Sequence, residues 1–485
     1  MEQQRRAGVS SEADGAAQHG LSRATSLILA AALFMEMMDS TVIATALPTI
    51  ATDIGTDPVS LKLALTSYLV ALAIFIPISG WLADRFGARR LLSLAILVFM
   101  VGSVACAFSD SLTTFVFSRF LQGMGGSMMT PVARILLVRA TPRGQLVSAM
   151  AWLAVPALIG PMMGPPIGGF LTTYLSWEWI FFINVPIGIL GIVMTMNFIP
   201  RYGLRRKTPL DLAGFLLVGT AFAGIVFGLS VISLPALDPL YGVSSTVAGV
   251  VAGIIYWRRA KRHPTPILNP TIFANRLFHR SVFGGFGFRL GMGASPFLLP
   301  LMLQVGYGLS AVQSGLVTFA GALGAIAFKP MAQRYYRTLG LRGAMMAAAV
   351  GAGCMMAAAA FVSPVLAPAL LLTLLFVAGI FRSAFFTIST ALALAEVSNE
   401  ETGQASAILS VAQNISIALA VALAGSVLQA SSMLRGDTLA LIDFRVALIM
   451  TALISIGSIA LLVGMPKTAD TVLPADRDTK TKLAE

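Results

Sequence analysis

The chain has 485 residues, of which 57% are hydrophobic and only 11% are charged, and its mean hydropathy is +0.84. Soluble domains carry roughly 25% charged residues, so this composition excludes an ordinary soluble protein and predicts an all-α protein that crosses a membrane many times. The formal net charge of +12 could indicate nucleic-acid binding, but the basic residues lie in short runs between apolar segments. Basic residues placed there set membrane orientation, so no nucleic-acid partner is expected.

The polar residues 1–25 precede the first apolar stretch. That stretch contains Glu36 and Asp39 and lacks a small-residue cleavage site, so we expect a retained first span after a cytoplasmic tail rather than a secretory signal. The two cysteines, Cys106 and Cys354, lie in apolar segments and have no metal-ligand spacing. We therefore predict buried, unreactive thiols and no disulfide, metal or other cofactor.

Apolar segments long enough to cross a hydrocarbon layer of about 30 Å occur along the whole chain. They lie near residues 26–48, 60–82, 91–109, 112–138, 146–174, 178–199, 210–232, 241–258, 280–304, 311–332, 342–362, 366–395, 404–430 and 444–465. These segments predict about fourteen transmembrane helices. With the N-terminus in the cytoplasm, almost every arginine-rich loop falls on the inner side, and an even number of spans returns the C-terminus to the cytoplasm.

A faint internal repeat divides the chain. The loop GWLADRFGARR (80–90) follows the second segment and FKPMAQRYYRTLGLR (328–342) follows the tenth, each with glycine and arginine at the turn. Segments nine to fourteen then repeat segments one to six, and duplicated transporters bind substrate near the midplane between their halves. The expected units are a tail at 1–25, a six-helix half at 26–200, two inserted helices at 201–265, a cytoplasmic connector at 266–279, a second half at 280–466 and a tail at 467–485.

Two carboxylates, Glu36 and Asp39, lie three residues apart in the first segment and therefore on one helical face. Ionisable side chains inside a membrane are costly and mark functional sites by default. Burial and a neighbouring carboxylate both favour the protonated form, so the pair could exchange a proton near neutral pH. The alternative is a structural hydrogen-bond cluster with Ser40, Thr41 or Thr45.

Three arginines also fall inside apolar segments. Arg119, in FSRFLQGMGGSMM, needs an anion, carbonyl groups or a water-filled cavity, and Asp39 or Glu36 could be its partner. A purely structural cation is the alternative. Arg289 and Arg382 lie in the second half without an obvious membrane carboxylate. They either face a polar cavity and contact substrate or bind backbone carbonyl groups.

The loop at 80–90 has a specific pattern. Its glycines permit a tight turn between helices, its aspartate can accept hydrogen bonds from a neighbouring helix N-terminus, and its arginines anchor the cytoplasmic side. The residues that we expect to act in conformational gating here are Gly80, Asp84, Arg85, Gly87 and Arg89. An ordinary orienting loop is the alternative, but the full pattern resembles the signature loop of the major facilitator superfamily.

The fifth segment contains ALIGPMMGPPIGGF (157–170), which is rich in residues that weaken helices. Glycine at every fourth position forms a smooth face for a neighbouring helix, whereas proline removes backbone donors and bends the helix. The stretch resembles the antiporter motif of the superfamily's drug and proton exchangers, which acts as a hinge and seal between the halves. This resemblance assigns conformational gating to Gly160, Pro161, Gly164, Pro165, Gly168 and Gly169. A generic packing face of small residues is the alternative.

Further resemblances cover nearly the whole chain. MDSTVIATALP (38–48) looks like the first-helix motif of the fourteen-span drug:proton antiporter branch, with Asp39 at the acidic position tied to proton coupling. RFLQGMGG places Arg119 on the arginine linked to proton transfer, and WEWIFFINVPIG (177–188) looks like the start of the sixth helix. Glu36, Glu178 and a second-half loop without aspartate depart from the pattern. Glu36 leaves the proton stoichiometry and the substrate charge open.

The resemblance implies a proton-coupled antiporter that exports amphipathic small molecules or drugs by alternating access, as a monomer in a bacterial inner membrane. Proton coupling is assigned to Asp39, Glu36 and Arg119. Substrate binding is assigned to Glu36, Arg289, Arg382, Tyr68 and Gln304. The alternatives are export of one endogenous lipid-like or anionic metabolite and a non-transporting membrane receptor. The sequence contains no GxxxxGK[ST] nucleotide loop and no evident nucleophile with its base, so neither an ATP-driven pump nor an enzyme is predicted.

Overall fold

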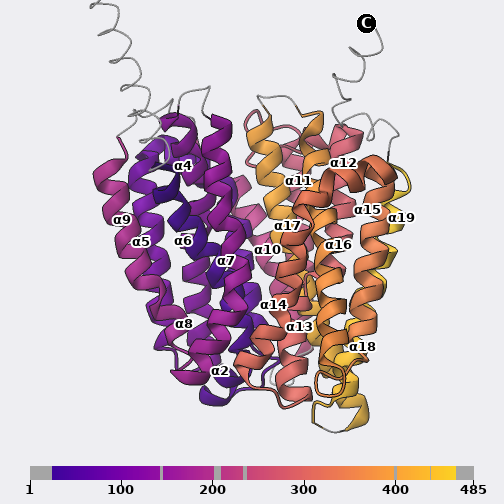
Figure 1. Cartoon of the computed structure of the whole chain (residues 1–485). Helices are drawn as coiled ribbons and strands as arrows, with labels where there is room; N and C mark the ends of the chain where they lie inside the picture. The colour runs from indigo at the N-terminus through magenta and orange to yellow at the C-terminus, as the bar shows by residue number, and fades with distance from the viewer. Residues whose placement is uncertain are drawn as a thin grey trace, which may run out of the picture.

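The computed structural model describes residues 25–141, 146–200, 209–232, 238–397, 401–436 and 438–465, and these form helices and turns without a β-strand. The helices stand side by side in two bundles, coloured indigo to magenta and orange to yellow in Figure 1. Large apolar side chains such as Phe117, Leu240 and Leu453 are exposed. Lipid tails, unlike water, can cover such side chains at no cost. The prediction of an all-α membrane protein is confirmed.

The first bundle starts with the span Thr25–Thr45, whose last turn is the 3-10 helix η1 (Ile43–Thr45). Its other helices are α2 (Leu47–Asp53), α3 (Lys62–Phe75), η2 (Ile76–Ile78), α4 (Ser79–Phe86), α5 (Ala88–Ala107), α6 (Leu112–Ala140), α7 (Leu146–Tyr174), α8 (Trp179–Phe182) and α9 (Asn184–Phe198). A capping box fixes the start of α6, because Ser111 and Thr114 satisfy each other's backbone amides.

Two inserted helices, α10 (Leu212–Val231) and α11 (Pro239–Ala260), begin at the side-chain caps Asp211 and Asp238. The second bundle follows. It contains η4 (Pro270–Ala274), α12 (Arg276–Met292), α13 (Ser295–Leu301), η5 (Met302–Gly306), α14 (Ala311–Ala327), η6 (Lys329–Met331), α15 (Ala332–Ala359), α16 (Pro368–Ala395), α17 (Thr402–Arg435), α18 (Leu441–Gly457) and α19 (Ile459–Leu462).

The two bundles share one unusual turn. In the first, Gly87 joins α4 to α5 with a φ of 89°, and in the second Gly340 interrupts α15 with a φ of 67°. Glycine adopts this left-handed region without the steric penalty of a Cβ atom, so each turn reverses the chain sharply. The structure thus places glycine turns in the loops GWLADRFGARR and FKPMAQRYYRTLGLR, where the sequence repeat lies.

The number of spans agrees with the prediction of about fourteen. Eleven stretches are long and apolar enough to span a membrane, and the longest of them, Ala311–Ala359, contains two spans because the chain turns at Gly340. The arginine-containing α6 and the glycine-rich α7 add two more, since 29 residues of helix extend about 43 Å.

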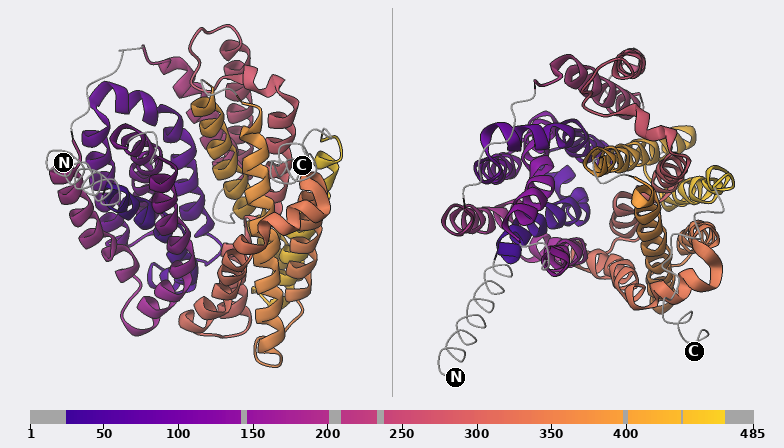
Figure 2. Two further views of the ribbon diagram at one scale, coloured as in Figure 1. Left: turned by 45° about the horizontal axis from the view of Figure 1, so that its top comes forward. Right: turned by 90° about the horizontal axis from the view of Figure 1, so that it is seen from above.

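The inserted helices lie outside the two bundles, at the junction between them, as the view from above in Figure 2 shows. α10 packs against α11, against α3 of the first bundle and against α17 of the second. α10 and α11 approach closely because glycines face glycines: a methyl group added at Gly249 would lie 2.7 Å from the Ile225 amide. The pair therefore covers one side of the junction.

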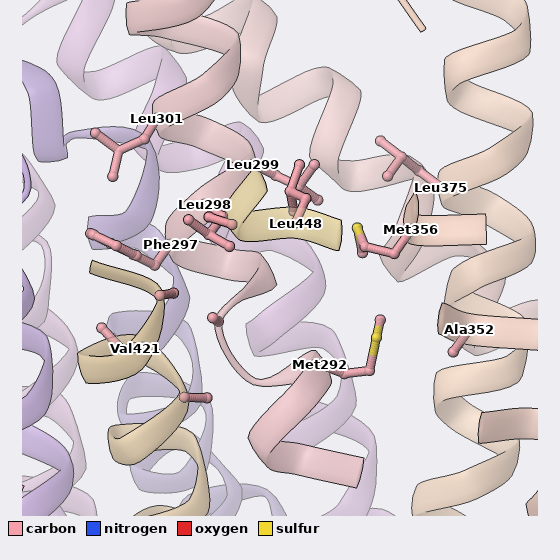
Figure 3. Close-up of a cluster of buried hydrophobic side chains, with 14 of the residues drawn as sticks. Met292, Phe297, Leu298, Leu299, Leu301, Ala352, Met356, Leu375, Val421 and Leu448 are labelled. Atoms are coloured by element: carbon pink, nitrogen blue, oxygen red, sulfur yellow. The ribbon is translucent and has the colours of Figure 1, made fainter. Parts of the chain in front are cut away.

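A continuous apolar core runs through the second bundle and extends into the first, where it includes Val42 and Phe115; part of it is drawn in Figure 3. Met292 of α12, Leu298 of α13, Met356 of α15 and Leu448 of α18 are buried there. Most of its side chains carry no polar group, so the core stabilises the bundle by close packing.

Candidate functional site

A cavity of about 1450 Å³ lies between the two bundles. Its walls include Glu36 and Tyr68 from the first bundle and Gln413 from α17. Asp84 at the end of α4 and Arg139 at the end of α6 also line it, so the cavity opens where α4 meets α5. We call this end of the molecule the basic end, because the arginine-rich loops lie here. It is at the top of Figure 1.

The opposite end is closed by contacts between the bundles. Gln304 in η5 donates a hydrogen bond of 2.9 Å to the Thr45 carbonyl oxygen. Beside it, α7 lies so close to α14 that a methyl group added at Gly169 would sit 2.5 Å from the Ala311 carbonyl oxygen, and the Pro165 carbonyl group also faces α14. The molecule is therefore open at the basic end and closed at the other.

Asp39 is fully buried at the centre of a polar cluster. The Arg119 Nη1 atom lies 2.8 Å from Asp39 Oδ2 in a buried ion pair. Asp39 Oδ1 accepts hydrogen bonds from Gln122 Nε2 at 2.7 Å and from Asn184 Nδ2 at 3.0 Å, and both amides also donate to Ser103 Oγ. We call these five residues the Asp39 cluster. It supplies the ion pair and hydrogen bonds that a buried carboxylate requires.

Glu36 has separate surroundings. It lines the cavity, whereas Asp39 does not, and its Oε2 accepts a hydrogen bond of 2.7 Å from Thr130 Oγ1 on α6. The hydroxyl groups of residues 40, 41 and 45 donate to backbone carbonyl groups three residues earlier in their own helix. In the described structure, none of these three hydroxyl groups therefore bonds to Glu36 or Asp39, as the alternative of a structural hydrogen-bond cluster would require.

Arg119 connects the Asp39 cluster to the cavity. It lines the cavity, and its guanidinium carbon lies 4.4 Å from the centre of the Tyr68 ring, a favourable position for a cation. Among the described residues, neither Arg119 Nε nor the Tyr68 hydroxyl has a hydrogen-bond partner. Buried polar groups of this kind are satisfied by water or by a ligand.

The loop at 80–90 forms an ion pair rather than a cap on a neighbouring helix. Asp84 Oδ1 lies 2.7 Å from Arg139 Nη2 on α6. Arg89 donates to the carbonyl oxygen that follows α9, and Arg85 is exposed. Gly80 lines the cavity and has open space where a side chain would stand. Only the turn glycine of this loop is required by backbone geometry.

The glycines of α7 face two different partners. Gly160, Gly164 and Gly168 pack against the first span, and a methyl group added at Gly164 would lie 2.0 Å from Thr41 Oγ1. Gly169 faces the second bundle instead. The four-residue spacing thus serves packing within one bundle, and the contact between bundles is made one position further on. The prolines of the motif lie within one continuous helix, half-buried at Pro161 and Pro165.

The arginines of the second bundle do not line the cavity. Arg289 is only 2% exposed, its guanidinium carbon lies 4.9 Å from the centre of the Phe386 ring, and its Nη2 atom has no partner in the described part of the chain. Arg382 is half-buried on α16. No described carboxylate lies within ion-pair distance of either arginine. Gln304 also lies outside the cavity, at the closed end.

Sequence reasoning missed several polar residues around the site. Gln122 and Asn184 donate hydrogen bonds to Asp39. The sequence feature that could have identified them is a polar amide side chain inside an apolar segment, and Gln122 also lies three residues after Arg119. Lys62 is fully buried at the start of α3, where its side chain packs against Gly425 of α17. Its signal was a lone lysine at the end of an apolar segment.

The cysteine prediction is half right. Cys106 is buried, whereas Cys354 is exposed on α15. The prediction for Cys354 is wrong because an apolar segment in a membrane can face lipid, so apolarity does not imply burial. Within the described ranges, no group of three His, Cys, Asp or Glu side chains could hold a metal ion.

Two helical bundles with a cavity between them, open at one end and closed at the other, define a membrane transporter. A family model described as Major Facilitator Superfamily matches residues 29–365 and 281–485. The chain belongs to this superfamily, as the resemblance of its loop and helix motifs predicted.

Curated relatives are similar over most of their length. A protein of Citrobacter koseri named MdtD, which its name describes as a candidate multidrug resistance protein, is 33% identical over 401 residues, covering 83% of this chain and 85% of its own. The MdtD protein of Escherichia coli is 33% identical over 403 residues with the same coverage. This similarity agrees with the drug-exporting branch that the sequence motifs resemble.

Solved transporter structures have the same fold. A peptide transporter of the POT family superposes with a TM-score of 0.69 at 14% identity, covering 93% of this chain and 99% of its own. The nucleoside transporter NupG gives a TM-score of 0.63 at 14% identity, with coverage of 92% and 99%. At such low identity the likeness concerns the fold alone.

Proposed function

We propose that the protein exports amphipathic small molecules, drugs among them, in exchange for protons by alternating access. The drug-resistance names of its relatives and the large cavity with mixed polar and apolar walls support this proposal. We place the basic end in the cytoplasm of a bacterial cell, at the inner membrane, because positive residues favour the inner side. The conformation with the open basic end then loads substrate from the cytoplasm.

The observation that carries the proposal is the position of Arg119, which contacts the cavity on one side and Asp39 on the other. A proton that binds to Asp39 Oδ2 removes the negative charge and weakens its attraction to the arginine. The freed guanidinium can then rotate, and the cluster can adopt a second arrangement. In this way the charge of Asp39 would select between conformations, which is what coupling requires.

Gating is proposed for the closed end. Export requires α7 to separate from α14 there, which would break the hydrogen bond from Gln304 to Thr45. The proposed rigid units are the six-helix halves at 26–200 and 280–466, acting as a monomer. Gly169 supports this role because α7 and α14 touch there through backbone atoms. Two helices in such contact can separate and come together again without rearranging side chains.

The cavity wall bears on the charge of the substrate. Glu36 lines the cavity and has no ion-pair partner in the part of the chain that the structure describes, so its side of the wall favours a cationic group, whereas the exposed Arg134 on the same wall suits an anionic one. We propose that Glu36 selects a cationic amphiphile. Export of an anionic metabolite was expected to use Arg289 and Arg382. Neither residue lines the cavity, so in the present conformation these two arginines do not support that alternative.

Transport by purified protein in liposomes tests the proposal. A tenfold ratio of proton concentration is worth about 1.4 kcal/mol per proton, so an imposed pH gradient can drive modest accumulation even when one proton is exchanged for one cation. We expect a fluorescent lipophilic cation to accumulate only when a pH gradient is imposed and to be released by a protonophore. Uncharged and anionic analogues serve as matched controls. Binding without any gradient-dependent accumulation would contradict the proposal and support a receptor.

A further inference from the structure

The C-terminal end of α11 carries positive charge that the fold does not neutralise. Arg258, Lys261 and Arg262 are exposed, and no described carboxylate lies within ion-pair distance of them. Their neighbour Arg259 is different, because its Nη1 atom lies 2.6 Å from Asp211. Three of the four basic side chains in residues 258–262 are therefore available to an anion outside the protein.

A small pocket lies at this point. It has a volume of about 460 Å³ and is distinct from the large cavity. Three arginines contribute to its lining, together with a histidine and two apolar residues. The lining residues are Ile255, Arg258, Arg259, Arg262, His263 and Pro264. Arginine forms bidentate hydrogen bonds with phosphate oxygens, so this set of donors suits a phosphate group.

The pocket continues into an apolar stripe on the same helix. Val247, Val251 and Ile255 follow one another at four-residue spacing and are 57%, 48% and 48% exposed, and Arg258 and Arg262 extend their face. A soluble phosphate would gain nothing from this stripe, whereas an acyl chain would cover it. The centre of the Trp257 ring lies 5.4 Å from Lys261 Nζ. Tryptophan is enriched where lipid headgroups meet the hydrocarbon, so this part of α11 lies at that depth.

We propose that α11 binds an anionic phospholipid, with the headgroup phosphate between Arg258 and Arg262 and an acyl chain along Val247, Val251 and Ile255. Orientation by positive charge alone would explain the arginines, but it requires neither a pocket nor an exposed apolar stripe in line with them. The site faces the lipid side of the inserted helices, which lie outside both bundles (Figure 2).

The site shares a wall with the large cavity. Pro264 lines both the pocket and the cavity, and Asp211, the partner of Arg259, lines the cavity. A phosphate that attracts Arg259 would compete with Asp211 for the same guanidinium. The bound lipid would therefore affect the segment that forms the cavity mouth. This consequence rests on the proposed transport function, whereas lipid binding itself does not.

Native mass spectrometry of delipidated full-length protein, titrated with phosphatidylglycerol, tests the binding. Because each basic residue near an anionic headgroup strengthens the attraction to it, Arg258→Gln/Arg262→Gln should weaken the tightest adduct by about tenfold or more. The matched control is Arg90→Gln/Arg334→Gln, which removes the same charge from exposed positions at the same end. This control should bind phosphatidylglycerol like the wild type.

Two further arms separate lipid from other anions. Ile255→Ala keeps all charges and should weaken phosphatidylglycerol binding by a smaller factor, since it removes only apolar contact. Phosphatidylcholine and free glycerol phosphate should not displace the adduct. Equal loss in the control pair, an unchanged adduct in Arg258→Gln/Arg262→Gln, or full competition by glycerol phosphate would overturn the proposal. None of these readouts depends on transport activity.

Discussion

The two bundles share a fold and a glycine turn, yet the surroundings of their buried arginines differ. In the first bundle Arg119 is paired with Asp39 and reaches the cavity. In the second, Arg289 is equally buried but packs on an aromatic ring, away from the cavity and without a carboxylate among the described residues. The buried cation of the first bundle thus has a carboxylate that could take up a proton in the proposed coupling, whereas the buried cation of the second bundle has none among the described residues.

The largest contrast is expected in stability when each arginine is replaced by methionine. Arg119→Met leaves Asp39 buried without its cation, and breaking a buried pair in this way costs about 3 to 5 kcal/mol. Arg289→Met removes a buried cation that has no carboxylate, so its effect should be neutral or stabilising. Thermal unfolding of both variants in detergent measures the difference.

A double variant provides the control for this contrast. Asp39→Leu combined with Arg119→Met removes both charges and should recover most of the stability lost in the single variant. Equal destabilisation by Arg119→Met and Arg289→Met would show that the two cations are held alike, and the contrast between the bundles would be lost.

A second contrast concerns glycines of α7 that face different bundles. Gly169→Leu should force α7 from α14 and hold the closed end apart, whereas Gly164→Leu should collide with Thr41 and destabilise the first bundle itself. Labelling of a cysteine placed at Gln304 by a membrane-impermeant maleimide, in a Cys354→Ser background, reports opening. Gly457→Ala, where a methyl group meets open space, is the matched control. Unchanged labelling in Gly169→Leu would argue against this contact as a gate.

A smaller effect is expected at the cavity acid. Glu36→Gln should weaken binding of a lipophilic cation by about tenfold and leave an uncharged analogue of the same shape unaffected, because only the charged interaction is removed. Thr130→Val, which removes the hydrogen-bond donor to Glu36, should keep the preference for the cation. Paired titrations with the two ligands give the ratio of their affinities. An equal loss of affinity for both ligands would mean that Glu36 contributes through packing and not through its charge.

The smallest effect is expected at the ion pair of the signature loop. Asp84 is 39% exposed and Arg139 is 14% exposed, so solvent screens the pair, and Arg139→Gln should change the free energy of unfolding by less than about 1 kcal/mol. The same thermal assay as for Arg119→Met checks this value. A loss as large as that of Arg119→Met would mean that burial does not decide the strength of these pairs.

The number of helices could be predicted because the length and apolarity of each segment are local properties. The turn at Gly87 was predictable from the loop pattern, and the pairing of Arg119 with a carboxylate of the first span was predictable because an unpaired charge inside a membrane is costly wherever the helices pack. Which helix a residue faces is not local. Spacing grouped Gly164 with Gly168 on one face, but only packing shows that this face meets the first span.

The location of the second-bundle arginines was unpredictable for the same reason. A sequence gives the depth of Arg289 in its segment but not the direction in which its side chain points. The cavity wall also depends on the conformation, because Gln304 at the closed end could be exposed when that end opens. The partners of Asp39 come from α6 and α9, and Ser103 of α5 joins them through Gln122 and Asn184; no sequence spacing brings such distant residues together.

The central claim is that Asp39 carries the coupled proton, and substrate-induced proton movement in liposomes tests it most directly. Wild-type protein loaded with a lipophilic cation should move protons in the opposite direction, as recorded by a trapped pH dye. Asp39→Asn should still exchange the cation down its gradient but should move no protons and ignore an imposed pH gradient. Proton movement in Asp39→Asn that still accompanies substrate at the wild-type ratio would contradict the account.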